Sequence, residues 1–186
     1  MRFLGLAVLL VATAAIAAPE PDSRTAIDFI AGAHALAAHG DDGGLHAGLG
    51  AAVRIHDLLP VHRLDIEMGW ERTQMHGDAD FDRFDRFRFT VGTGFDLGND
   101  FDLAVGAGLE VLDATRVVPS TTNAFSLSFR DYKPVASAGV ARFVDLGGAF
   151  LGGEIVARIS EHDGSARGLD FSYVGADAEL RVILRI

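Results

Sequence analysis

The most constraining feature of this sequence is an alternation of apolar and polar residues with a period of two. Between Leu45 and Ile55 every odd position is apolar, whereas the even positions hold His, Gly, Ala and Arg. A β-strand places alternate side chains on opposite faces, so the pattern predicts a strand with one apolar face and one polar or small face. A helix would scatter Arg54 and His46 among the leucines.

The same alternation recurs along the rest of the chain and predicts eight strands. They span about residues 26–38, 44–57, 61–75, 83–97, 100–113, 128–144, 149–161 and 170–186. No linker or change of composition divides them, so residues 26–186 are expected to form one domain.

The polar faces of these strands combine many glycines with charges of both signs, while the apolar faces are almost free of charge. Glycine is a poor residue for a water-facing strand, which argues against a soluble sandwich. Strands that face lipid need long apolar outer faces, and an eight-stranded barrel has a lumen that its own side chains can fill. The sequence therefore predicts an all-β, eight-stranded antiparallel up-and-down transmembrane β-barrel.

The links between the predicted strands support this topology. The links at 58–60, 97–100 and 145–148 are short, those at about 76–82, 114–127 and 162–169 are longer, and the first link at 39–43 is short. Transmembrane barrels alternate short periplasmic turns with longer outer loops, which places both termini on the periplasmic side.

Residues 1–17 have the pattern of a secretory signal peptide. Met1-Arg2 is a short positive start, Phe3 to Ala15 is apolar, and Ala15-Ile16-Ala17 fits a small-x-small cleavage site. A short segment, residues 18–25, then leads into the barrel. The chain has no cysteine, which excludes disulfides, thiolate metal sites and a cysteine-linked lipid anchor.

The signal peptide, the eight strands, the link pattern and the final strand from Gly175 to Ile186, preceded by Tyr173, resemble the small outer-membrane barrels of Gram-negative bacteria, the OmpA/OmpX-like group. Such barrels often end in Phe, whereas this chain ends in Ile186. The resemblance implies insertion by the barrel assembly machinery after passage past periplasmic chaperones. It also implies a monomer in contact with outer-membrane lipid and lipopolysaccharide.

Three functions follow from these patterns. The first is a non-enzymatic outer-membrane barrel with an envelope-structural role or a loop-mediated adhesion role. The second is an outer-membrane enzyme that modifies lipid A or phospholipid, and the third is a soluble secreted barrel that binds a small ligand, as lipocalins do. A net charge of −10 argues against nucleic acid as a partner, and eight strands leave no wide conducting channel.

Several clusters resemble reactive sites but are explained without catalysis, cofactor or metal. Ser160-Glu161-His162-Asp163 places a nucleophile, a base and acids in a row, but a triad needs them convergent in space. His34 and His46 are expected to face the lumen and fill it. The acidic run 78–82 lacks the later Gly and Glu of a calcium loop and is interpreted as a solvated loop.

The predicted register gives one specific expectation for the lumen. A turn centred near residue 77 or 78 places Glu67 opposite Arg88, and a turn near Asn99 places Arg88 opposite Glu110. All three side chains face inward, so we expect a structural Glu67–Arg88–Glu110 cluster, in which the forked donors of one arginine serve two carboxylates.

We expect the mature protein to begin at Ala18, because cleavage after Ala17 satisfies the small-x-small rule. Mass spectrometry of the protein isolated from cell envelopes checks this. Retention of Met1 in that protein would contradict the export prediction.

Overall fold

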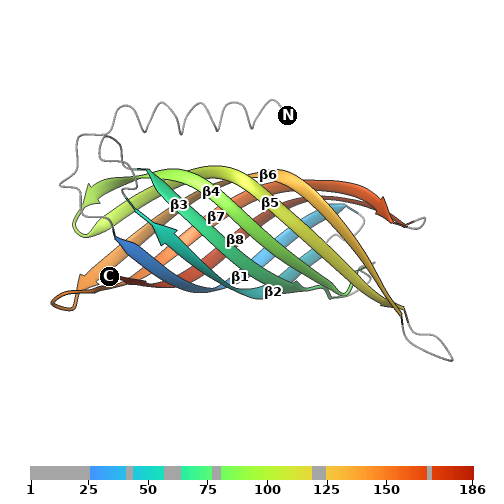
Figure 1. Ribbon diagram of the computed structural model, residues 1–186, viewed down its shortest axis with the longest axis horizontal. Coiled ribbons are helices and arrows are strands. Elements are labelled where there is room, and N and C mark those ends of the chain that lie inside the picture. Colours follow the sequence, from blue (N-terminus) through green and yellow to red (C-terminus); the bar gives the residue numbers. More distant parts are fainter. Residues whose placement is uncertain (1–25, 41–43, 57–63, 77–80, 119–124, 167–168) are drawn as a thin grey trace.

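A computed structural model of the chain describes residues 26–40, 44–56, 64–76, 81–118, 125–166 and 169–186. Its strands are β1 (Ile27–Gly40), β2 (Gly44–Ile55), β3 (Asp65–Gln74), β4 (Arg83–Gly98), β5 (Phe101–Val118), β6 (Phe125–Asp145), β7 (Phe150–Ala166) and β8 (Leu169–Arg185). Each strand pairs antiparallel with the next, and β1 pairs with β8, so that the sheet closes into a barrel (Figure 1). The predicted eight-stranded antiparallel up-and-down barrel is confirmed.

The expected signal peptide, residues 1–17, and the segment 18–25 lie outside the described residues, as does the predicted link 58–60. Within the described ranges, no helix is long and apolar enough to span a membrane.

The two ends of the barrel differ in how the strands are joined. At one end, here called the turn end, β1 begins, β8 ends, and tight turns join β4 to β5 and β6 to β7. Asn99 and Asp100 both have positive φ, 55° and 65°, as the central residues of a type I′ hairpin turn must. The short links predicted at 97–100 and 145–148 are therefore confirmed. The opposite end is called the loop end.

Strands near the loop end are longer than predicted. The link expected at 114–127 is wrong for most of its length, because β5 and β6 stay paired as far as Val118 and Phe125. Likewise β7 continues past the predicted end at 161 to Ala166. The alternation of apolar and polar residues is weaker over these extensions than in the rest of each strand. The sequence pattern therefore did not predict that the strands continue there.

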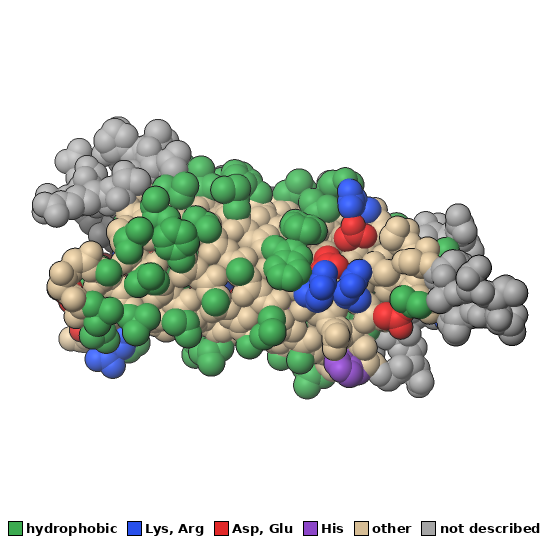
Figure 2. Space-filling model, turned by 60° about the horizontal axis from the view of Figure 1, so that its bottom comes forward, with side chains coloured by type: hydrophobic (Ala, Val, Ile, Leu, Met, Phe, Trp, Pro, Cys, Tyr) green, Lys and Arg blue, Asp and Glu red, His purple; other side chains and the backbone are tan. Residues whose placement is uncertain are grey.

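The charged face of the sheet lies inside the barrel and the apolar face outside, as predicted. Phe87 is 49% exposed, whereas its neighbours Arg86 and Arg88 are 0% and 4% exposed. Figure 2 shows hydrophobic side chains spread over most of the barrel wall. The molecule is thus inverted relative to a water-soluble barrel, whose apolar side chains pack inward.

Two apolar clusters lie in the lumen, one toward each end. The cluster near the loop end contains Leu36, Phe81, Phe84, Leu112 and Ala114, and the cluster near the turn end contains Ile30, Ala141, Phe143 and Ile183. Phe81 precedes β4 in the link from β3, and its ring lies 6.3 Å from the ring of Phe84. The loop-end cluster therefore forms an apolar plug, and much of the charged lumen lies between the two clusters.

We expect Leu112→Ala to lower the free energy of unfolding by about 2–5 kcal/mol, because it empties a packed position in the plug. Leu112 is 0% exposed, whereas Leu109 on the same strand points outward and is 47% exposed. Leu109→Ala is the matched control and should cost much less. Urea unfolding of the protein refolded in detergent measures both, and equal losses would show that the plug does not stabilise the barrel.

Candidate functional site

The central lumen holds a network of buried arginines and carboxylates. Glu71 on β3 is its hub: its carboxylate lies 2.8 Å from Arg86 and 2.9 Å from Arg158, and it also accepts a hydrogen bond from Arg88. Arg158 projects from β7 and so reaches across the lumen to β3. The hub therefore links opposite walls of the barrel.

The network continues to β8 through Asp177 and Glu179. Arg158 donates to Asp177 at 2.9 Å and to Glu179, and Arg86 on β4 donates to the same Asp177 at 2.6 Å. The contacts of Arg158 join the neighbouring strands β7 and β8, whereas the contact of Arg86 with Asp177 joins β4 to β8 across the lumen. The cross-lumen contact fixes the cross-section of the barrel in a way that the backbone ladder alone does not.

The part of the network nearer the turn end is a ring of two arginines and two glutamates. Arg54 lies 2.8 Å from Glu67 and 2.9 Å from Glu154, and Arg181 lies 2.8 Å and 3.2 Å from the same two carboxylates. Arg181 also donates to Glu179 at 2.8 Å, which joins this ring to the hub. Buried charges are costly unless they are paired and hydrogen-bonded, and here the forked guanidinium donors supply both.

The lumen is filled rather than open. Its central cavity has a volume of about 30 Å³, room for about two water molecules. Glycines let neighbouring strands and the side chains of the network approach closely: a Cβ added to Gly32 would lie 2.2 Å from the Oε1 atom of Glu179. A Cβ added to Gly108 would lie 1.9 Å from the carbonyl oxygen of Phe89, so no larger residue fits there without movement of the backbone.

The predicted Glu67–Arg88–Glu110 cluster is half correct. Arg88 lies opposite Glu110 as expected, with 3.8 Å between their side-chain nitrogen and oxygen. The β3–β4 register, however, differs by two residues, so that Arg88 faces Gly69 and Glu67 faces Thr90. The expected pairing of Glu67 with Arg88 is therefore wrong.

Glu71 takes the place that was expected for Glu67 at Arg88, while Glu67 binds Arg54 and Arg181. The observed register corresponds to a β3–β4 hairpin centred one residue further along the chain than predicted. Moving the centre of a hairpin by one residue moves the register by two, which keeps every side chain on the same face. Alternation therefore predicts the face of Glu67 but not its partner.

The buried histidines face the lumen as predicted. His34 shares a hydrogen bond of 2.7 Å with the Thr73 hydroxyl, and His46 accepts one of 3.2 Å from the backbone N–H of His76. Within the part of the chain that the structure describes, no three His, Asp or Glu side chains are grouped as metal ligands.

Strand alternation divides the Ser160–Asp163 cluster between the two faces of the barrel. Ser160 and His162 are buried in the lumen, whereas Glu161 is exposed on the outside, and the side chain of Asp163 lies outside the described residues. His162 lies between two carboxylates, 2.9 Å from Glu110 and 3.2 Å from Asp131. Both ring nitrogens of His162 are therefore within hydrogen-bond distance of a carboxylate.

The acidic run 78–82 is only partly described, because residues 77–80 lie outside the described ranges. Phe81 is buried in the plug, and the side chain of Asp82 accepts a hydrogen bond from the backbone N–H of Val117. The prediction of a solvated loop is therefore wrong at Phe81. In the sequence Phe81 is flanked by aspartates, and these made the whole run look water-exposed.

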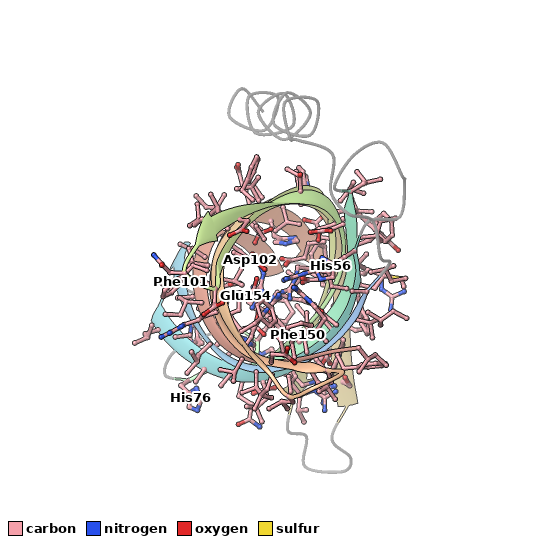
Figure 3. The ribbon with its side chains drawn as sticks, turned by 90° about the vertical axis from the view of Figure 1, so that its left-hand side faces the viewer. His56, His76, Phe101, Asp102, Phe150 and Glu154 are labelled. Atoms are coloured by element: carbon pink, nitrogen blue, oxygen red, sulfur yellow. The ribbon has the colours of Figure 1, made fainter. Side chains whose placement is uncertain are left out.

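A cluster at the turn end was missed by the sequence analysis. His56, just beyond the end of β2, lies 2.6 Å from Asp28 and 2.9 Å from Asp65, and Arg185 donates to Asp28 at 2.8 Å. Figure 3 shows His56 directed into the mouth of the barrel. The alternation of the sequence does place Asp28 on β1 and Arg185 on β8 at inward-facing positions. It does not show that the two residues meet, because they come together only when β1 and β8 pair and close the barrel.

The surroundings of His56 favour its charged form. Burial by itself lowers the pKa of an imidazole, but hydrogen bonds and ionic attraction from Asp28 and Asp65 outweigh it and raise the pKa of His56 to about 9. The Arg185 guanidinium lies 3.2 Å from the Nε2 atom of His56, the nitrogen that faces Asp28.

The fold is similar to that of solved outer-membrane proteins. Neisserial surface protein A shares 15% identity with this chain at a TM-score of 0.57, covering 88% of this chain and 99% of its own. Ail, the attachment invasion locus protein of Yersinia pestis, shares 14% identity at a TM-score of 0.55, covering 88% of this chain and 100% of its own. No family model and no curated protein matches the chain. The expected resemblance to small eight-stranded barrels is confirmed at the level of the fold.

We expect Glu71→Gln to lower the free energy of unfolding by about 3–5 kcal/mol, because it removes the counter-charge of three buried arginines. Glu161→Gln, the same change on the outer face of β7, is the control and should have little effect. Urea unfolding in detergent compares the two variants. A cost at Glu71 no larger than at Glu161 would contradict the structural role of the hub.

We expect the stabilisation by His56 to be lost at alkaline pH. Its pKa is about 9 in the folded protein against 6.5 for an ordinary histidine, so its contribution is complete below pH 6.5 and declines as the pH rises through 9. The free energy of unfolding is measured for the wild type and for His56→Gln from pH 6 to pH 10. The difference between the two values should shrink by about 3 kcal/mol over that interval. Parallel curves for the two proteins would refute this role of His56.

Proposed function

We propose that this chain is an integral outer-membrane β-barrel that neither conducts nor catalyses. Its role is to stabilise the envelope or to present loops for adhesion at the cell surface. In this proposal the turn end faces the periplasm and the loop end faces outward. The barrel assembly machinery and periplasmic chaperones act during its assembly, and the mature barrel is a monomer surrounded by outer-membrane lipid and lipopolysaccharide.

The observation that carries the proposal is the inverted distribution of side chains. Large apolar side chains on the wall are widely exposed, among them Leu49 at 68%, Ile155 at 64% and Leu180 at 65%. Soluble monomers rarely expose contiguous apolar patches of more than a few hundred Å², so a wall of this kind indicates a lipid surrounding. The same distribution argues against a lipocalin-like binder, because the lumen is filled by charged side chains rather than shaped as an apolar cavity.

The packing of the lumen supports a barrel that does not conduct. The arginine–carboxylate network crosses it, and the apolar plug covers the network on the loop-end side. The plug also argues against the lipid-modifying enzyme, since Ser160 and His162 point into the filled lumen, away from the lipid that such an enzyme must reach.

An interaction role for the loop end is supported by the placement of the longest strands. β5 and β6 comprise 18 and 21 residues, more than the roughly 9–11 that a tilted strand needs to span a membrane. Their hairpin therefore has the length to project beyond the bilayer, where loops on a rigid scaffold usually carry recognition. One protein of similar fold is named an attachment invasion locus protein and another a surface protein, which is a precedent for this role.

Membrane fractionation and refolding test the proposal together. We expect the protein in the outer-membrane fraction, and we expect refolded protein inserted in vesicles to migrate differently on gels before and after heating. Planar-bilayer recordings should show no steady conductance. A monodisperse monomer that stays folded in buffer without detergent would contradict the membrane location. Stable channels in the recordings would contradict the proposal that the filled lumen does not conduct.

A further inference from the structure

The outer wall of the barrel has a charged cluster where apolar side chains are expected. Arg72 on β3 and Arg83 on β4 both bind Asp85, at 2.8 Å and 3.2 Å. Figure 2 shows basic and acidic side chains gathered in one patch of this face, toward the loop end and beside the hydrophobic wall. Asp113 and Arg130 form a separate pair in the neighbouring strands, 2.6 Å apart.

The Arg72–Asp85–Arg83 cluster is positively charged in an acidic protein. Two guanidinium groups share one carboxylate, which leaves one positive charge in excess, whereas the whole chain carries −10. Both arginine side chains are accessible, at 45% and 41% exposure. The excess positive charge is therefore accessible to an anion from outside the barrel.

A groove of about 750 Å³ on the outer wall leads to this cluster. Five of its nine lining residues are small or apolar and four carry polar side chains: Ala33, Ala47, Gly48, Leu49 and Trp70, and His34, Arg72, Gln74 and His76. The guanidinium carbon of Arg72 lies 5.3 Å from the centre of the Trp70 ring, so the apolar groove and the charged cluster meet at this residue. Figure 3 shows His76 on the outside of the barrel, away from the lumen.

From this juxtaposition we infer that the groove and the Arg72–Asp85–Arg83 cluster form a binding site for a phosphorylated acyl lipid of the outer leaflet. The acyl chain lies along Ala33, Ala47 and Leu49, and the phosphate binds Arg72 and Arg83. Arginine is suited to this because its planar fork binds phosphate through two hydrogen bonds. The inference rests on the proposed membrane location and adds to it a site and a class of ligand.

Trp70 is the only tryptophan of the chain and lines the groove, so its fluorescence reports occupancy directly. Full-length refolded protein in neutral detergent micelles is titrated with lipid A as the phosphorylated probe. Dephosphorylated lipid A and inorganic phosphate form the comparison arms. We expect a saturable change with lipid A, and a much weaker response to each comparison arm, because recognition needs both the chain and the phosphate.

The double variant Arg72→Gln/Arg83→Gln should bind lipid A at least about tenfold more weakly, since it removes the charge-assisted hydrogen bonds. Arg142→Gln is the matched control. Arg142 is also exposed on the outer wall and lies 5.3 Å above an aromatic ring, that of Phe101, but at the turn end. The change of fluorescence on titration is compared, rather than the starting spectrum, because loss of Arg72 alters the surroundings of Trp70.

A second pair of variants tests the groove independently of charge. Ala33→Leu fills it and should weaken binding of lipid A, whereas Ala157→Leu, on the exposed outer face of β7, should not. Equal binding of dephosphorylated lipid A, saturation by inorganic phosphate alone, or equal losses in Arg142→Gln would each overturn the inference. So would a stable dimer that buries Trp70 without lipid.

The vesicle experiment separates this inference from the proposed function. A wild-type protein that fails to insert in vesicles contradicts the membrane location itself. A protein that inserts and shows heat-dependent migration, but does not prefer the phosphorylated probe, contradicts the lipid site alone.

Discussion

Closure of the β1–β8 ladder is the constraint on which the rest of the structure depends. A strand in lipid has no water to satisfy its backbone N–H and C=O groups, so an open edge is excluded and the sheet must return to its first strand. The paired residues run from Asp28 with Arg185 to Gly40 with Tyr173. Once the sheet is closed, alternate residues have only two destinations, the lipid and the lumen.

The small lumen then determines which side chains are acceptable inside it. Its arginines and carboxylates would be costly singly, but each guanidinium serves two or more carboxylates. Arg158, for example, binds Glu71 across the barrel and Asp177 and Glu179 on the neighbouring strand. Glycines such as Gly32, where a Cβ would lie 2.2 Å from Glu179, leave room for the side chains of this network. The apolar plug and the network together make a solid core, which is why the proposed activity lies at the loops and on the outer wall rather than inside.

Particular residues show where sequence reasoning succeeded and where it failed. Arg88 was correctly placed in the lumen and opposite Glu110, because a tight turn at Asn99 leaves one register for β4 and β5. The pairing of Glu67 with Arg88 failed, because the longer β3–β4 link permits registers that differ by two residues with the same faces. Phe81 was taken for part of a solvated loop and is instead buried in the plug.

The sequence by itself determined the number of strands, the face of the side chains within the predicted strands and the closed, inverted character of the barrel. It did so because the period of two is a local property of the backbone. Only the tertiary structure decided which charges meet across the lumen, that His56 lies between Asp28 and Asp65, and that Arg72 joins an apolar groove to Arg83. These contacts join residues distant in sequence or depend on the exact register, and no local pattern encodes the distances between them.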